Sequence, residues 1–116
     1  MLITIDPSSA EPLFEQLVAA IRSQIIEGTL VSGERLPAAR DLGESLEVNV
    51  HTVLKAYQVL RDEGFIELRR GRGAVVTARA HDYLQLSADI TRLVADARKL
   101  DLTPGALAAL VRKEYQ

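Results

Sequence analysis

A mainly α-helical fold with one small β-hairpin is predicted by two periodicities along the chain. Apolar residues recur at steps of three and four through most of the 116 residues, which is typical of helices that bury one face. Between Phe65 and Val76 the period falls to two, which indicates two short strands around a glycine-bearing turn. The apolar fraction of 47% and the charged fraction of 26% are those of a globular protein, not of a disordered chain.

The first helix is expected over residues 12–27. Pro12 suits the first turn, where its missing N–H removes no hydrogen bond, and Gly28 suits the position just past the last turn. One broad apolar stripe joins these two ends, and we expect its Phe14 to be a core residue: Leu13, Phe14, Leu17, Val18, Ile21, Ile25 and Ile26.

A helix-turn-helix is predicted next. The second helix opens at Pro37 and ends at Glu47-Val48, and the third begins after Asn49, a good N-cap, and stops at Gly64. Two helices of about 10 and 14 residues joined by a turn of three or four residues have the helix-turn-helix pattern. The third helix buries an apolar face that includes Tyr57, expected to be core.

The distribution of charge says more than its total. A net charge of −2, from 14 basic and 16 acidic side chains, weakly disfavours nucleic acid as a partner. However, residues 1–68 carry 5 basic and 11 acidic side chains, whereas residues 69–79 carry 4 basic and none acidic. The positive stretch contains the hairpin turn, Arg69 to Gly73. A helix-turn-helix followed at once by a basic hairpin is a winged helix, and we interpret the positive stretch as its wing.

The last third of the chain predicts a separate two-helix arm. One stripe ends near Lys99-Leu100, and Thr103 caps a final helix that Pro104 opens. Two amphipathic helices of this size cannot cover each other's apolar faces or enclose a ligand cavity. We therefore divide the chain into a winged helix-turn-helix domain (1–79) and a helical dimerisation arm (80–116). The expected dimerisation residues are Tyr83, Leu86, Ile90, Leu93, Val94, Leu107, Leu110 and Val111.

Residues suited to duplex DNA cluster at two places. The N-terminal end of a recognition helix enters the major groove, and here it carries Asn49, His51, Thr52 and Lys55. In the wing, two glycines let the backbone approach the minor groove with arginine beside them. Arginine is a fixed charge whose planar fork grips a phosphate or a guanine edge. The candidate wing residues are Arg70, Gly71, Arg72 and Gly73.

An ordered series of motifs resembles the winged-helix domain of the GntR family of bacterial transcription regulators, from about residue 11 to 78. The short two-helix tail resembles the YtrA subfamily, in which the tail serves for dimerisation and is too small to be the usual effector domain. The segments that carry the resemblance are Pro12 to Leu17, Ile21-Arg22, Gly28 to Leu30, Gly33 to Pro37, Arg40 to Leu42, Thr52-Val53, Ala56-Tyr57, Leu60, Glu63 to Ile66 and Gly71 to Gly73.

The resemblance implies a dimeric transcription regulator and a set of operator-facing residues. Carried over position by position, these are Arg35, Arg40, Thr52, Gly71, Arg72 and Gly73. Three sites depart from the family pattern: Ala38 replaces a serine, Val50 stands where many members have arginine, and Ala74-Val75 replaces Thr-Phe. These departures concern the usual base contacts more than the DNA-binding role.

Other function classes find little support. The chain has no cysteine, which excludes disulfides, thiolate zinc sites and cysteine catalysis. The adjacent pair His81-Asp82 does not converge easily on a metal, and neither paired carboxylates nor a P-loop is present. We therefore expect a non-enzyme without metal or cofactor. No membrane-length apolar run or secretion signal is found, so a cytoplasmic location is expected.

The sequence thus predicts a homodimeric, sequence-specific DNA-binding regulator that represses from an inverted-repeat operator in double-stranded DNA. The tail points to no particular small-molecule effector. One alternative is a winged-helix protein-interaction module without DNA binding, favoured by the acidic balance of residues 1–68. Another alternative is the N-terminal part of a longer GntR-type regulator. The compact, capped tail that ends at Tyr115-Gln116 argues against this alternative.

Overall fold

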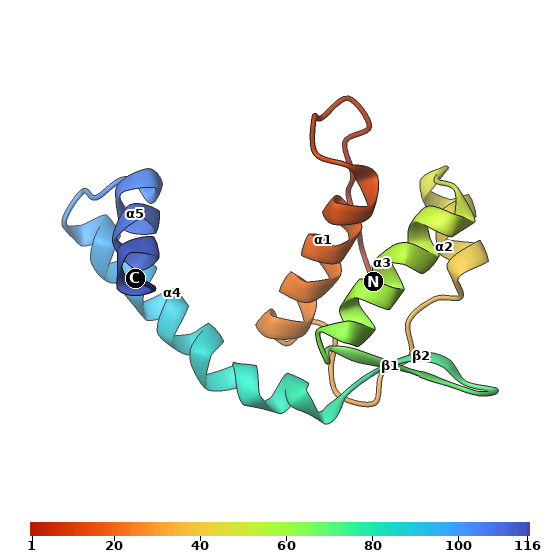
Figure 1. Ribbon diagram of the computed structural model, residues 1–116. Coiled ribbons are helices and arrows are strands. Elements are labelled where there is room, and N and C mark those ends of the chain that lie inside the picture. Colours follow the sequence, from red (N-terminus) through yellow and green to blue (C-terminus); the bar gives the residue numbers. More distant parts are fainter. The chain divides into compact units, whose positions relative to one another are not determined.

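The computed structural model describes all residues, 1–116, and divides them into two compact units, Met1–Leu84 and Gln85–Gln116 (Figure 1). The predicted class, mainly helical with one small hairpin, is confirmed. The elements in chain order are α1 (Leu13–Glu27), α2 (Ala39–Leu46), α3 (Val50–Asp62), β1 (Ile66–Arg69), β2 (Gly73–Val76), the 3-10 helix η1 (Ala78–Tyr83), α4 (Leu84–Lys99) and α5 (Pro104–Glu114).

The core of the first unit lies where α3 packs against both α1 and α2. The apolar stripe of α1 supplies Leu17, Ile21 and Ile25, all fully buried, and α3 supplies Val53 and Leu60. No charged or polar residue is buried with them. Because both stripes have helical spacing, the periodicity of the sequence identified this core correctly.

The wing is a two-stranded antiparallel hairpin with a third edge. β1 and β2 pair in the register Ile66 to Val76 and Arg69 to Gly73. The loop before α2 adds to the free edge of β2: the N–H of Leu36 donates to the Ala74 carbonyl at 2.8 Å. The Val76 N–H donates in turn to the carbonyl of Glu34 at 2.9 Å, which places Arg35 opposite Val75. The loop that precedes the helix-turn-helix is therefore fixed to the hairpin.

The segment after the wing folds back onto the end of α3. Thr77 Oγ1 donates to the Gly64 carbonyl at 2.8 Å, and Arg79 Nη1 donates to the Glu63 carbonyl at 2.7 Å. The Tyr83 ring stacks on Phe65 with 5.4 Å between centroids. These contacts belong to the first unit, which therefore extends past the predicted boundary at residue 79.

The second unit buries very little. In α4 only Ala97 is buried and in α5 no residue is, although both helices carry the predicted apolar stripes. Thr103 caps α5 as expected, its Oγ1 accepting from the Ala106 N–H at 3.2 Å, and Pro104 is the first residue of the helix. The two helices form a groove of about 650 Å³ with an apolar lining.

Three expectations from the sequence need correction in their details. Phe14 is half-buried and takes no part in the core cluster, because it lies at the rim between α1 and α3. Tyr83 belongs to η1 and packs on Phe65, so its ring is used within the first unit. The second helix begins at Ala39, two residues after Pro37, with no side-chain cap at Ala38.

Candidate nucleic-acid interface

The turn between α2 and α3 is held by a close backbone approach. Glu47 ends α2 in the left-handed region, with φ of 57°, and the Val48 N–H donates to the Gly43 carbonyl at 2.8 Å. A β-carbon at Gly43 would lie 2.8 Å from the Val48 carbonyl oxygen. Only glycine lets the backbone of α2 and the backbone of the turn approach this closely.

The N-terminal end of α3 presents polar side chains to solvent. Asn49 caps the helix as predicted: its Oδ1 accepts from the His51 N–H at 2.8 Å, which leaves its amide N–H groups available. His51 and Lys55 are exposed and Thr52 is half-buried. At this end the free helix amides favour negative charge. The first turn of α3 therefore presents polar groups to solvent.

A hydrogen bond from α3 fixes the segment that leads into α2. The Tyr57 hydroxyl donates to the Pro37 carbonyl at 2.6 Å, and burial raises the pKa of Tyr57 above its ordinary value. Arg40 lies exposed in the first turn of α2, three residues past this anchor. Its guanidinium therefore projects from a fixed helix end.

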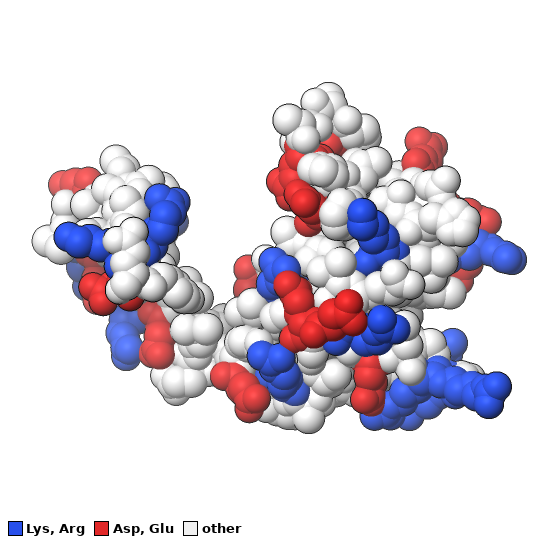
Figure 2. Space-filling model, in the orientation of Figure 1, with Lys and Arg blue, Asp and Glu red and all other residues white.

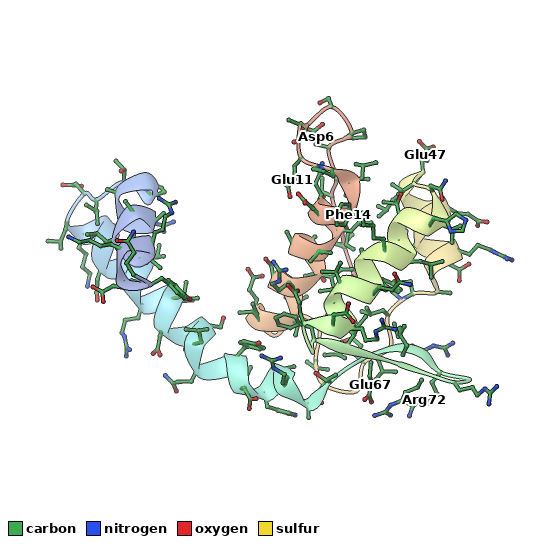
Figure 3. The ribbon with its side chains drawn as sticks, in the orientation of Figure 1. Asp6, Glu11, Phe14, Glu47, Glu67 and Arg72 are labelled. Carbon is green, nitrogen blue, oxygen red and sulfur yellow. The ribbon has the colours of Figure 1, made fainter.

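The wing turn carries two arginines that no carboxylate neutralises. Gly71 and Gly73 have φ of 79° and 75°, the left-handed region that favours glycine, and a β-carbon at Gly71 would meet nothing. Arg70 and Arg72 are exposed and form no ion pair, whereas Arg69 pairs with Glu67 on its own strand. Figure 2 shows the basic side chains gathered over the end of the hairpin, and Figure 3 places Arg72 there.

Arg35 joins this cationic group through the third edge of the sheet. Its Nε lies 3.9 Å from the position that a β-carbon would take on Gly73. Strand pairing of residue 35 with residue 75 brings it there across some 40 positions of sequence. The structure thus brings Arg35 to the base of the wing, beside Gly73.

The positive stretch found by counting does not coincide fully with the wing. Arg79 lies in η1, where its guanidinium bonds the Glu63 carbonyl and faces the rings of Phe65 and Tyr83 at 5.8 and 5.9 Å. Its charge therefore serves the packing of η1. The unpaired positive charge of the hairpin therefore covers a shorter segment than the whole basic stretch, residues 69–79. It is carried by Arg70 and Arg72.

A hollow of about 520 Å³ lies between the start of α1 and the start of α3. It brings together all four predicted residues of α3 and also Phe14, which Figure 3 labels near the start of α1. The centroid of the Phe14 ring lies 3.8 Å from the Lys55 ammonium. Neither the contact of Phe14 with Lys55 nor the contribution of Gly43 to the turn was predicted from the sequence. The available signals were an aromatic residue at the first turn of a helix and a glycine inside a helical pattern.

The structure contains neither a cluster of metal ligands nor a helix that could span a membrane. No three His, Asp or Glu side chains come together as metal ligands would. No helix has both the length and the apolar character needed to cross a bilayer.

A helix-turn-helix with polar residues at the start of its second helix, followed by a cationic hairpin, defines the winged helix-turn-helix class of domain. Residues 13–76 match the family of bacterial regulatory proteins, gntR family, over more than half of the chain. The chain therefore belongs to the gntR family, a class of regulators and not of enzymes.

Particular relatives agree along most of the chain. The HTH-type transcriptional repressor YtrA of Bacillus subtilis is 33% identical over 102 residues, which cover 83% of this chain and 78% of the relative. YtrA from Sulfolobus acidocaldarius, a GntR-family transcription factor, aligns with a TM-score of 0.63 and 29% identity over 97% of this chain and 96% of that one. The DNA-binding domain of AraR in complex with operator ORX1 aligns with a TM-score of 0.57 and 26% identity, over 65% of this chain and 93% of that chain.

Proposed function

We propose that this chain is a homodimeric transcriptional repressor that binds an inverted-repeat operator in double-stranded DNA. In each half-site, α3 enters the major groove with its N-terminal end and the wing contacts the adjacent minor groove. A repressor of this kind acts in the cytoplasm, on the promoter DNA to which it binds.

The observation that carries the DNA-binding part is the pair of unpaired arginines at the exposed wing turn, Arg70 and Arg72, with Arg35 at its base. Most protein–DNA contacts go to the phosphate backbone, and cations held on a rigid hairpin supply them at small entropic cost. The polar residues of α3 then face base edges. The operator complex of the AraR domain, similar to this chain over residues of the winged helix, supports this use of the fold.

The dimer is supported by apolar surface that the second unit leaves uncovered. Of the expected dimerisation residues, Val94 and Leu107 are half-buried in the groove between the two helices. Large side chains on both helices remain roughly half exposed: Leu86, Ile90, Leu93, Leu110 and Val111. A 32-residue unit cannot form a sufficient core alone, and a second copy offers the same faces in a closed, two-fold arrangement.

Charge does not oppose association of two copies. Residues 85–116 carry 5 basic and 4 acidic side chains, so the second unit is close to neutral. One of the acidic side chains, Asp89, is already paired with Arg92 at 2.9 Å. A dimer on an inverted repeat follows, because two recognition helices related by a two-fold axis read half-sites about one helical turn, ~34 Å, apart or a multiple of it. Repression needs no further part, since a dimer on a promoter excludes polymerase.

The dimer is tested in the full chain by a charge placed in the groove. Leu93 is 43% exposed and lines the groove, whereas Leu100 is 80% exposed and does not. By light scattering, the wild type and Leu100→Glu are expected to have twice the 12.7 kDa mass of one chain, and Leu93→Glu the mass of one. A Leu93→Glu chain that remains dimeric would place the interface elsewhere.

The DNA-binding part is tested by the salt dependence of binding to random-sequence duplex. A DNA reader binds at low salt and is released steeply as salt rises, because each phosphate contact frees condensed counterions. A protein-interaction module with this fold would not be retained at all. Retention with a steep salt slope supports the proposal, and absence of binding at 50 mM salt contradicts it.

A further inference from the structure

Lys55 is held over an aromatic ring at the edge of the recognition helix. Its ammonium lies 3.8 Å from the centroid of Phe14, the second residue of α1. Lys55 is exposed and forms no ion pair with any carboxylate. The Phe14 ring is thus the one partner that the structure gives this cation.

Phe14 does not have the ordinary role of an apolar residue in this stripe. Its neighbours Leu17 and Val18 are buried in the core, whereas Phe14 is half-buried and outside the core cluster. Phe14 lines the hollow that Lys55 also lines, and it lines a second hollow with Glu11 and Glu15. Neither of these carboxylates pairs with Lys55.

The start of α1 is itself anchored, so that the ring has a fixed place. Gln16 Nε2 donates to the carbonyls of Asp6 and Glu11, at 3.0 and 2.8 Å, and Gln16 Oε1 accepts from the Asp6 N–H at 2.8 Å. Ser8 donates to the Asp6 carboxylate through both its N–H and its hydroxyl. The loop before α1 is therefore folded onto the first turn of the helix. Phe14 is part of this anchored turn and borders the start of α3.

We propose that Phe14 is a positioning residue for DNA binding, which holds the Lys55 ammonium where it meets a backbone phosphate. The inference rests on the proposed function and names a residue outside the predicted interface. Lys55 follows Thr52 by three residues and His51 by four, so all three lie on one side of α3. A cation held on that side reaches the phosphates next to the bases that the helix reads.

The ring positions the ammonium without neutralising it. A cation over an aromatic face is attracted by the quadrupole of the ring, whereas a carboxylate partner would compete with phosphate for the same N–H groups. The N–H groups turned away from the ring stay free to donate. A lysine restricted in this way loses less rotamer entropy when it meets the phosphate than a lysine free in solvent.

The contact is measured first in the free protein, without DNA. In the wild type, the ε-methylene protons of Lys55 are expected to show upfield ring-current shifts by NMR. The shifts are expected to disappear in Phe14→Leu and to persist in Phe14→Tyr, which keeps the aromatic face. Unshifted protons in the wild type would overturn the proposal, because the ring would then not hold the ammonium.

The role in DNA binding is measured by a double-mutant cycle with Lys55→Gln on a duplex of fixed sequence. Phe14→Leu is expected to weaken binding by about two- to fivefold, because the freed lysine then loses part of its rotamer entropy on meeting the phosphate, and Phe14→Tyr is expected to restore binding. In the Lys55→Gln chain, Phe14→Leu is expected to change nothing further. Lys55→Gln should also reduce the salt slope by about 0.9, whereas Phe14→Leu keeps the charge and should leave the slope unchanged.

The outcomes separate this inference from the proposed function. Equal weakening by Phe14→Leu with and without Lys55 would show a merely structural role and overturn the inference alone. A Phe14→Leu chain that is poorly folded by circular dichroism moves the comparison to Phe14→Met, for which the same coupling is expected. A wild type that binds no duplex at low salt, with the ring-current shifts present, would overturn DNA binding and the inference with it.

Discussion

Replacement of Gly43 by alanine is expected to destabilise the first unit, although alanine is the better helix former. The β-carbon would lie 2.8 Å from the Val48 carbonyl oxygen, 0.6 Å inside the 3.4 Å at which ordinary contact begins. The Val50 N and Cα atoms, both at 3.6 Å, close off the neighbouring space. All these atoms are backbone atoms, of the turn or of the first residue of α3, so a side-chain rotation cannot relieve the contact.

The magnitude follows from two opposed terms. Overpacking against an unyielding neighbour costs about 1–3 kcal/mol, and the higher helix propensity of alanine returns up to about 1 kcal/mol. A net loss of roughly 1–2 kcal/mol in the free energy of unfolding is expected for Gly43→Ala. For a unit of this size, the loss corresponds to a melting temperature lower by about 4–16 °C.

The assay is urea and thermal unfolding followed by circular dichroism, with Gly105→Ala as the matched control. Gly105 is also helical, but a β-carbon there meets nothing within 4 Å, so only the propensity gain remains. The control is expected to be at least as stable as the wild type. A Gly43→Ala chain as stable as this control would refute the close approach as the reason for glycine in the turn.

Three further changes have expected outcomes that follow from single contacts. Arg72→Ala is expected to lower the salt slope of DNA binding by about 0.9 in anisotropy titrations at several salt concentrations, because an unpaired cation is lost. Arg69→Ala is expected to have a smaller effect, because Arg69 is already paired with a carboxylate. Arg79→Ala is expected to lower the free energy of unfolding by about 1–2 kcal/mol, because it removes the hydrogen bond to the Glu63 carbonyl and the cation over two rings. Unchanged stability in urea would contradict the role of Arg79 in packing η1. Burial raises the pKa of Tyr57 in the folded state, so the unfolded chain loses this proton first and the free energy of unfolding should fall as the pH rises above about 10. Tyr57→Phe should lose less stability than the wild type in urea titrations across pH 9–11. An equal loss in both chains would assign the effect to other groups.

The helices of this protein were predictable because their packing leaves a regular trace in the sequence. The stripe of α1 and the cap at Asn49 each report a local event, the burial of one helix face or the satisfaction of one N–H. The hairpin was likewise visible from the change of period and from Gly71 and Gly73, both of which adopt positive φ. Local physics therefore predicted the elements of the winged helix within the expected domain, residues 1–79.

Features that depend on distant partners were not predictable in this way. The strand-like pairing at Arg35 involves too few residues to show a period, and its partner Val75 lies in another element. Arg79 was counted with the cationic wing because it follows the wing closely in the sequence. Its guanidinium, however, donates a hydrogen bond to the Glu63 carbonyl. For Phe14, helical spacing alone does not separate a core position from one at the rim, where a lysine of another helix covers the ring.

Two copies of this chain are proposed to read one operator with two-fold symmetry. Selection of bound sequences from a random duplex pool by the full chain tests this proposal, since the enriched sequence reports DNA binding and half-site symmetry together. We expect an inverted repeat whose half-sites lie about one helical turn, ~34 Å, apart or a multiple of it. Enrichment of a single unrepeated site, or no enrichment at all, would contradict the claim.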